Sequence, residues 1–161
     1  MKIDKAITDV RDAEDDLARR LRGISERHAA EHDLYHLGHT LASKCAQRVD
    51  RLGPVAERYG VTPREIAAES PGMLEAVRHK TSELLGRSEK AGLLLLRDLR
   101  ELYLSAQATE ICWVVLMQGA KAVRDQELLG VVSSCHEEAE TCGKWVRNQI
   151  KEVSPQVLAT G

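Results

Sequence analysis

Apolar residues recur at alternating intervals of three and four along the first 24 residues of the chain. The positions are Ile3, Ile7, Val10, Leu17, Leu21 and Ile24. This spacing places every member on one face of an α-helix and is typical of a helix that packs in a bundle. One slot of the series is not apolar, and Glu14 fills it. The first helix is therefore predicted to carry a carboxylate on the face that it buries.

Helical periodicity continues through most of the remaining chain in three further segments. These are residues 30–52, 89–123 and 126–153. Gly53 and Pro54 are expected to end or kink the second helix, and a turn at Arg124 and Asp125 is expected to separate the last two helices. No segment shows the strict alternation of a β-strand. The chain is therefore predicted to be all-α.

The connection between the second and third long helices, residues 61–88, is expected to be helical as well. Thr62, Pro63 and Glu65 combine a capping box with proline at the first helical position. Two long hairpins joined by such a crossover make an antiparallel four-helix bundle with one long connection. At 161 residues, the chain is expected to form one domain, residues 1–161.

Charge and apolar content exclude several classes of partner. A formal net charge of -2 gives no attraction to nucleic acid or to anionic membranes. The longest apolar runs, residues 93–96 and 114–117, are too short for a membrane span, and the start of the chain has no apolar signal core. The four cysteines form no CxxC pair, so reduced, buried thiols are expected. We therefore expect a cytoplasmic protein that binds neither nucleic acid nor membrane.

Two further acids occupy slots in the apolar stripes of the last two helices. Glu110 lies fourteen residues before Arg124 and Glu138 fourteen residues after it, so an antiparallel pair sets them opposite each other. Together with Glu14, they make three carboxylates that repel each other when buried, unless a metal ion, a cationic partner or shared protons compensate them. The alternative is that each helix is slightly rotated, which leaves these acids in water at the edge of the stripe.

Four short segments, by their order and spacing, resemble the ferritin-like superfamily, and within it the YciE/YciF-like branch of small bacterial proteins. They are AEDDL (13–17), RVDRL (48–52), AQATE (106–110) and HEEAE (136–140). The resemblance implies a ferritin-like four-helix bundle whose middle holds a di-iron or di-manganese site. Such a site is built from Glu residues and Glu-x-x-His or Glu-x-x-Glu pairs, and Glu14, Glu110 and Glu138 match positions of that kind.

The sequence departs from this pattern on two helices, so a degenerate metal site is expected. Residues 42–45 of the second helix offer no oxygen ligand of the needed type, and Trp113 lies three residues after Glu110. A partial site for iron or manganese would use Glu14, Glu110 and Glu138, with Glu137, Cys135 and Cys142 nearby. Alternatively, Lys44 or Arg48 supplies the positive charge in place of a metal.

A row of histidines is a second candidate for metal binding. His28, His32, His36 and His39 are spaced four, four and three, so they share one face of the second helix, opposite its apolar residues. A histidine pair at i and i+4 can chelate zinc or nickel, and His32, His36 and His39 are the candidate ligands. The alternative is a solvated or interface face that becomes positive below about pH 6.5.

These observations leave two functions from different classes. The first is a structural or interaction protein, a ferritin-like bundle with a vestigial or partial carboxylate site. The second is an iron- or manganese-binding protein of oxidative-stress or oxidoreductase chemistry, in which Tyr103 is a nearby redox side chain. Whether the protein is an enzyme stays open, and no catalytic residue is identified. A homo-oligomer, most simply a dimer, is expected in either case.

Overall fold

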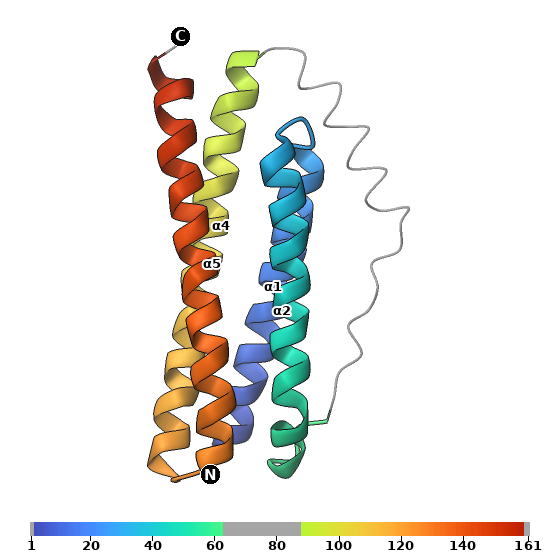
Figure 1. Cartoon of the computed structure of the whole chain (residues 1–161), viewed down its shortest axis with the longest axis vertical. Coiled ribbons are helices and arrows are strands. Elements are labelled where there is room, and N and C mark those ends of the chain that lie inside the picture. Colours follow the sequence, from blue (N-terminus) through green and yellow to red (C-terminus); the bar gives the residue numbers. More distant parts are fainter. Residues whose placement is uncertain (1, 63–87, 160–161) are drawn as a thin grey trace.

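The computed structural model describes residues 2–62 and 88–159, which form four helices and no strand (Figure 1). The helices are α1 (Ile3–Arg27), α2 (His32–Arg58), α4 (Ser88–Ala122) and α5 (Gln126–Ala159). The all-α prediction is confirmed for this part of the chain. The predicted crossover helix lies almost wholly outside the described residues. None of the four helices combines the length and the apolar composition that a membrane crossing needs.

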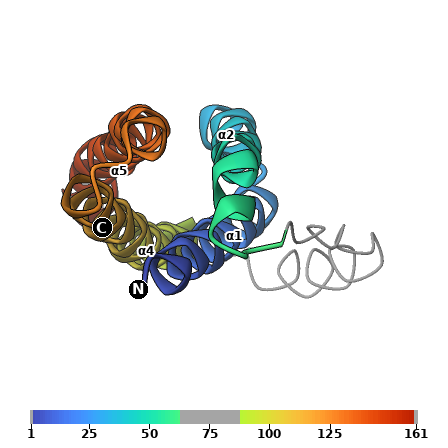
Figure 2. The ribbon, with the colours of Figure 1, turned by 90° about the horizontal axis from the view of Figure 1, so that it is seen from below.

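The four helices form a bundle in which every neighbouring pair is antiparallel. α1 and α5 run in one direction along the bundle, and α2 and α4 run in the other (Figure 1). Viewed along the axis, the helices follow one another in the order α5, α4, α1, α2 (Figure 2). Of the neighbouring pairs, α2 and α5 pack together least closely. Long side chains therefore have room to cross the bundle on that side.

Two helices continue past internal prolines. α2 runs through Gly53 and Pro54 to Arg58, so the expectation that they end this helix is wrong. α5 runs through Pro155 to Ala159, beyond its predicted end. A proline inside a helix frees the carbonyl four residues before it. Both prolines are exposed, so water can bind the carbonyls that they free.

The turn between α4 and α5 lies where the sequence predicted it. Arg124 adopts a left-handed φ of 58°, and the Asp125 carboxylate accepts the Leu128 backbone N–H at 3.0 Å as an N-cap. The same carboxylate accepts hydrogen bonds from the Tyr59 hydroxyl at 2.7 Å and the Arg58 guanidinium at 2.9 Å. Asp125 thereby joins the end of α2 to the start of α5.

The buried face of α1 follows the prediction, whereas those of α4 and α5 are each rotated by less than one residue from the predicted face. In α1, the six apolar residues of the predicted stripe and Glu14 are all buried. In α4, the buried residues are Leu95, Leu99, Leu102, Ala106, Thr109, Trp113, Leu116 and Ala120. In α5, they are Leu128, Val132, Cys135, Ala139, Cys142, Gly143 and Val146. Thr109 and Ala139 therefore occupy the buried slots that were predicted for Glu110 and Glu138.

The buried apolar residues form two clusters, one toward each end of the bundle. Between them lies a polar layer that consists of Glu14 on α1, Arg48 on α2 and Thr109 on α4, each at most 1% exposed. On each of these helices, the apolar residues before the polar one belong to one cluster and those after it to the other. The middle of the bundle is thus the place where charged side chains are most fully removed from water.

Candidate functional site

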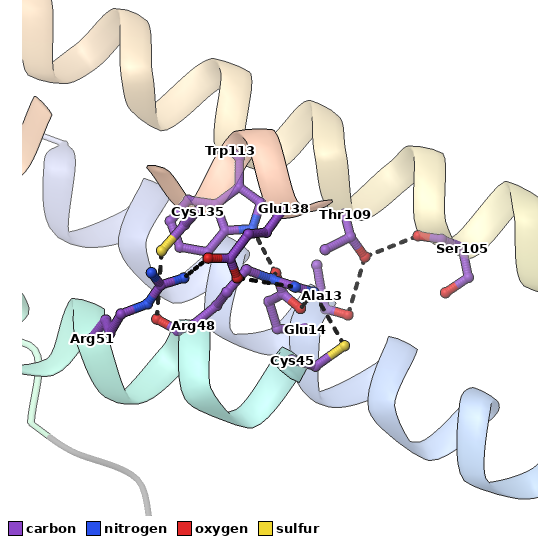
Figure 3. Close-up of polar contacts among 10 residues, drawn as sticks. All are labelled: Ala13, Glu14, Cys45, Arg48, Arg51, Ser105, Thr109, Trp113, Cys135 and Glu138. Carbon is purple, nitrogen blue, oxygen red and sulfur yellow. Dashed lines mark hydrogen bonds and ion pairs between the residues drawn. The ribbon is translucent and has the colours of Figure 1, made fainter. Parts of the chain in front are cut away.

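Glu14 and Arg48 form an ion pair in the polar layer (Figure 3). Arg48 Nε donates to Glu14 Oε1 at 2.7 Å, and Arg48 Nη2 donates to Glu14 Oε2 at 2.8 Å. Such a two-point, charge-assisted contact fixes both the distance and the orientation of the planar groups. The structure therefore realises the alternative in which the Arg48 guanidinium compensates the buried carboxylate.

The Trp113 indole supplies a third donor to the same carboxylate. Trp113 Nε1 donates to Glu14 Oε1 at 2.6 Å, and the indole is fully buried. The sequence pattern marked Trp113 only as a departure from the metal-ligand pattern and did not predict this contact. The available signal was that a buried indole N–H needs an acceptor, and Glu14 is the acidic residue of the facing buried stripe. The contact connects α4 to the pair formed by α1 and α2.

Arg48 also reaches toward α5, where Glu138 lies at the edge of the centre. Arg48 Nη2 donates to Cys45 Sγ at 3.3 Å, and Arg48 Nη1 lies 4.0 Å from Glu138 Oε2. Arg51 Nη2 lies closer to this carboxylate, 2.9 Å from Glu138 Oε1. The Arg51 and Glu138 side chains are each 41% exposed, so their pair contributes at most ~1 kcal/mol. Figure 3 shows Glu138 on the α5 side of the centre.

The environment keeps the arginine charged and the neighbouring thiols neutral. Burial alone would lower the pKa of Arg48, but the hydrogen bonds to Glu14 and its negative charge raise this pKa above the ordinary value. Burial, reinforced by the Glu14 charge, raises the pKa of the Cys45 thiol far above its usual range. Burial also raises the pKa of Cys135 and of Cys142 to about 11. Since the thiolate is the nucleophilic form of cysteine, these three side chains are poor nucleophiles at neutral pH in the folded chain.

The three predicted metal ligands do not converge on one point. Glu14 is bound by its guanidinium and indole donors, Glu138 pairs with Arg51, and Glu110 Oε1 lies 3.5 Å from His136 Nε2. Rotation of α4 and α5 leaves the Glu110 side chain 20% exposed and that of Glu138 41% exposed. Within residues 2–62 and 88–159, no three His, Cys, Asp or Glu side chains form a group that could hold a metal ion. The structure therefore does not bring Glu14, Glu110 and Glu138 together into one ligand group in this part of the chain.

The residues expected to assist that set are also dispersed. Cys135 and Cys142 lie in different apolar clusters, and Glu137 is exposed. Tyr103, the predicted redox side chain, accepts a hydrogen bond from Arg147 at 3.0 Å toward the surface. Cys135, Cys142 and Glu137 belong to no group of three or more His, Cys, Asp or Glu side chains that could hold a metal ion among the described residues.

The histidine row shares a face of α2, but its members have different partners. The His32 and His36 rings are exposed and stacked, with centroids 6.4 Å apart. His39 Nε2 instead lies 3.0 Å from Glu26 Oε1 on α1, and Tyr35 packs edge-on against both His36 and His39. The predicted zinc or nickel ligands, His32, His36 and His39, therefore form no ligand group among the described residues.

His28 does not belong to the row, because it lies in the turn between α1 and α2. It is buried, and its Nε2 lies 2.8 Å from Asp98 Oδ2 on α4, which also binds Arg27 Nη1 at 2.7 Å. Burial would raise the pKa of Asp98, but the hydrogen bonds from His28 and Arg27 lower it below the usual range. This contact connects the end of α1 to α4.

The polar centre is suited to holding helices in position. The hydrogen bonds to Glu14 come from α2 and α4, and the surroundings keep the Arg48 guanidinium charged and the Cys45 thiol neutral. A buried polar contact of this kind fixes the register of packed helices.

Models of known protein families, curated proteins and solved structures were each compared with the chain, and none matches it.

Proposed function

We propose that this chain is a metal-independent helical-bundle protein of the cytoplasm that works by associating with another protein chain. We propose further that its relation to the ferritin-like superfamily is one of architecture. The observation that carries the proposal is the Arg48 guanidinium, which lies within 2.8 Å of both oxygens of Glu14 in the middle of the bundle. That carboxylate is compensated by the chain itself and needs no added cation.

Electrostatics oppose a metal ion at this position. A divalent cation that reached Glu14 would approach a guanidinium with a raised pKa, and repulsion between two buried positive charges is strong where water is excluded. Glu110 and Glu138 lie beside His136 and Arg51 and outside the buried stripes. Moving them inward would require rotation of two helices against their packed apolar clusters.

The outer surface supports association as the role of the bundle. Six large apolar side chains are exposed in the described part of the chain, and four of them lie on α4. These four are Leu93, Leu104, Ile111 and Val115. Several exposed apolar side chains on one helix indicate a candidate interaction surface. The register fixed by the polar centre holds this surface in one shape.

Metal analysis of protein purified without chelators tests the proposal. Cells are grown with added iron and manganese, and the melting temperature is then measured with Mn²⁺, Fe²⁺ or Zn²⁺ added. We expect substoichiometric metal and an unchanged melting temperature. The matched control is the double variant Glu110→Ala with Glu138→Ala, which should have the same low metal content. Stoichiometric metal that this variant loses would overturn the proposal.

A further inference from the structure

The outer face of α4 carries an apolar stripe separate from the one that it buries. Leu104, Ala108, Ile111 and Val115 are spaced four, three and four, which places them on one side of the helix. All four are exposed, and Leu104, Ile111 and Val115 are 59%, 58% and 58% exposed. We call these four residues the outer stripe. A helix that is apolar on two faces is typical of a helix covered on both.

The outer face of α5 differs from that of α4. Its exposed residues at the corresponding depth include Ser134, Glu137, Thr141 and Lys144, which are all polar. α1 likewise exposes Asp9, Asp12, Arg19 and Arg20 along its length. The exposed large apolar residues of the described chain are therefore concentrated on α4. A general tolerance of exposed apolar residues does not explain this concentration.

We infer that the outer stripe binds a second copy of this chain, with the two α4 helices antiparallel. The inference rests on the proposed function and deepens it by naming the partner. From Leu93 to Ala122, α4 runs about 44 Å at 1.5 Å per residue. Two helices of that length, with their flanks, can bury on the order of 800 Å² per partner, which is typical of a stable dimer.

The distribution of charge along α4 favours the antiparallel arrangement. Arg97 and Arg100 are exposed before the outer stripe together with one acid, Glu101, so this end of the face has a net positive charge, whereas the uncharged Gln118 and Ala122 are exposed after it. In a parallel pair, each arginine would lie opposite the same arginine of the other copy. Like charges that face each other are destabilising. An antiparallel pair centred between residues 109 and 110 sets Arg97 near Ala122 and Arg100 near Gln118. The arginines of the two copies then lie at opposite ends of the contact.

The outer stripe is self-complementary about the same centre. Leu104 of one copy lies beside Val115 of the other, and Ala108 lies beside Ile111. A small residue opposite a large one allows the helix backbones to approach closely and the side chains to interdigitate. Such pairing gives an isologous contact, which closes at two copies.

Sedimentation equilibrium of the full chain at several concentrations tests the inference, with Ile111→Glu as the disrupting variant. A glutamate in the contact of each copy should weaken dimerisation by roughly 100-fold or more. Leu158→Glu is the control, because Leu158 is 68% exposed near the end of α5 and away from the outer stripe. We expect wild type and Leu158→Glu to be dimers and Ile111→Glu to be a monomer with an unchanged helical circular dichroism spectrum.

A mixing experiment tests the orientation. Ile111→Glu mixed with Ala108→Lys should restore a dimer, since these positions face each other across the antiparallel contact. If a dimer formed only when Ile111→Glu was mixed with Ile111→Lys, this pairing register would be wrong. A monomeric wild type, or a dimer that Ile111→Glu leaves intact, would overturn the second-copy inference. Metal content is measured separately. A metal-free monomer would contradict this inference but not the proposed function, which would then require a different partner protein.

Discussion

The Arg48 guanidinium lies alongside the Glu14 carboxylate, with Nε to Oε1 at 2.7 Å and Nη2 to Oε2 at 2.8 Å, between the two apolar clusters of the bundle. Removing both charges from water costs about as much as their attraction returns, so the pair adds little net stability. Removing one partner alone leaves a buried, uncompensated charge. The pair therefore acts chiefly as a constraint on how α1 and α2 align.

The Trp113 hydrogen bond should be measurable as a loss of stability in Trp113→Phe. Phenylalanine preserves most of the buried ring but cannot donate to Glu14 Oε1, which Trp113 Nε1 contacts at 2.6 Å. A hydrogen bond to a charged group contributes about 1.5–3 kcal/mol, so urea denaturation should show a loss of that size. Trp145→Phe is the control, because Trp145 is half-buried at the edge of a cluster. Equal losses in the two variants would contradict a special role for the indole N–H.

Thiol reactivity should follow burial. Cys45, Cys135 and Cys142 are buried with raised pKa values, about 11 for Cys135 and Cys142. At pH 8 their thiolate fraction is very small, and a disulfide reagent should modify them only when the protein unfolds. The half-buried Cys112 should react first in the native protein, and Cys112→Ser should abolish that early phase. Mass spectrometry of partly labelled protein checks the order, and early labelling of Cys45 would contradict it.

Asp125 should contribute to stability in a pH-dependent way. Hydrogen bonds from the Leu128 amide and the Tyr59 hydroxyl lower the pKa of Asp125 to about 2 in the folded chain, against about 3.9 when unfolded. A lowered folded pKa gives stability that is present above pH ~4 and is lost as the pH falls toward ~2. The melting-temperature advantage of wild type over Asp125→Asn should therefore shrink across this interval. A difference that stays constant from pH 6 to pH 2 would show that the carboxylate charge does not matter.

At Gly38, the backbone of α2 lies close against α1. A Cβ added there would run into the Ser25 hydroxyl, which donates to the Leu21 carbonyl at 2.8 Å in a buried position. Gly38→Ala should therefore cost about 1–3 kcal/mol through overpacking and the disturbed hydrogen bond. Gly130→Ala is the matched control, since nothing lies within 4 Å of its added Cβ. There alanine should gain roughly 0.5–1 kcal/mol of helix propensity, and a gain at both positions would contradict the close approach.

The buried face of α1 was predictable because its off-stripe residues are mostly polar. α4 is ambiguous, since adjacent apolar residues such as Leu95 and Leu96 fit two helix rotations equally well. The layer of Thr109 and Glu110 separates the two rotations. Thr109 is cheaper to bury, because its hydroxyl bonds the Ser105 carbonyl of its own helix at 2.9 Å. Periodicity alone does not include the free-energy cost of burying a carboxylate. The prediction therefore assigned Glu110 to the buried position that Thr109 occupies.

The candidate site was predicted only in part, because the buried face was unambiguous for α1 but not for α4. Glu14 lies on the one helix without ambiguity, and it is buried as expected. Arg48 was among the charges considered for its compensation, but a sequence pattern cannot say which cation reaches a carboxylate across a bundle. The choice depends on the rotation of α2, which buries Arg48 and leaves Lys44 exposed.

A double-mutant cycle between Glu14 and Arg48, measured by urea denaturation with a chelator present, tests the central claim most directly. We predict that Glu14→Leu and Arg48→Met each cost about 3–5 kcal/mol, because each leaves a buried charge unpaired, and that the double variant costs far less than their sum. Additive losses within ~0.5 kcal/mol, or a coupling that appears only when a metal ion is added, would contradict the claim that this guanidinium compensates the buried carboxylate.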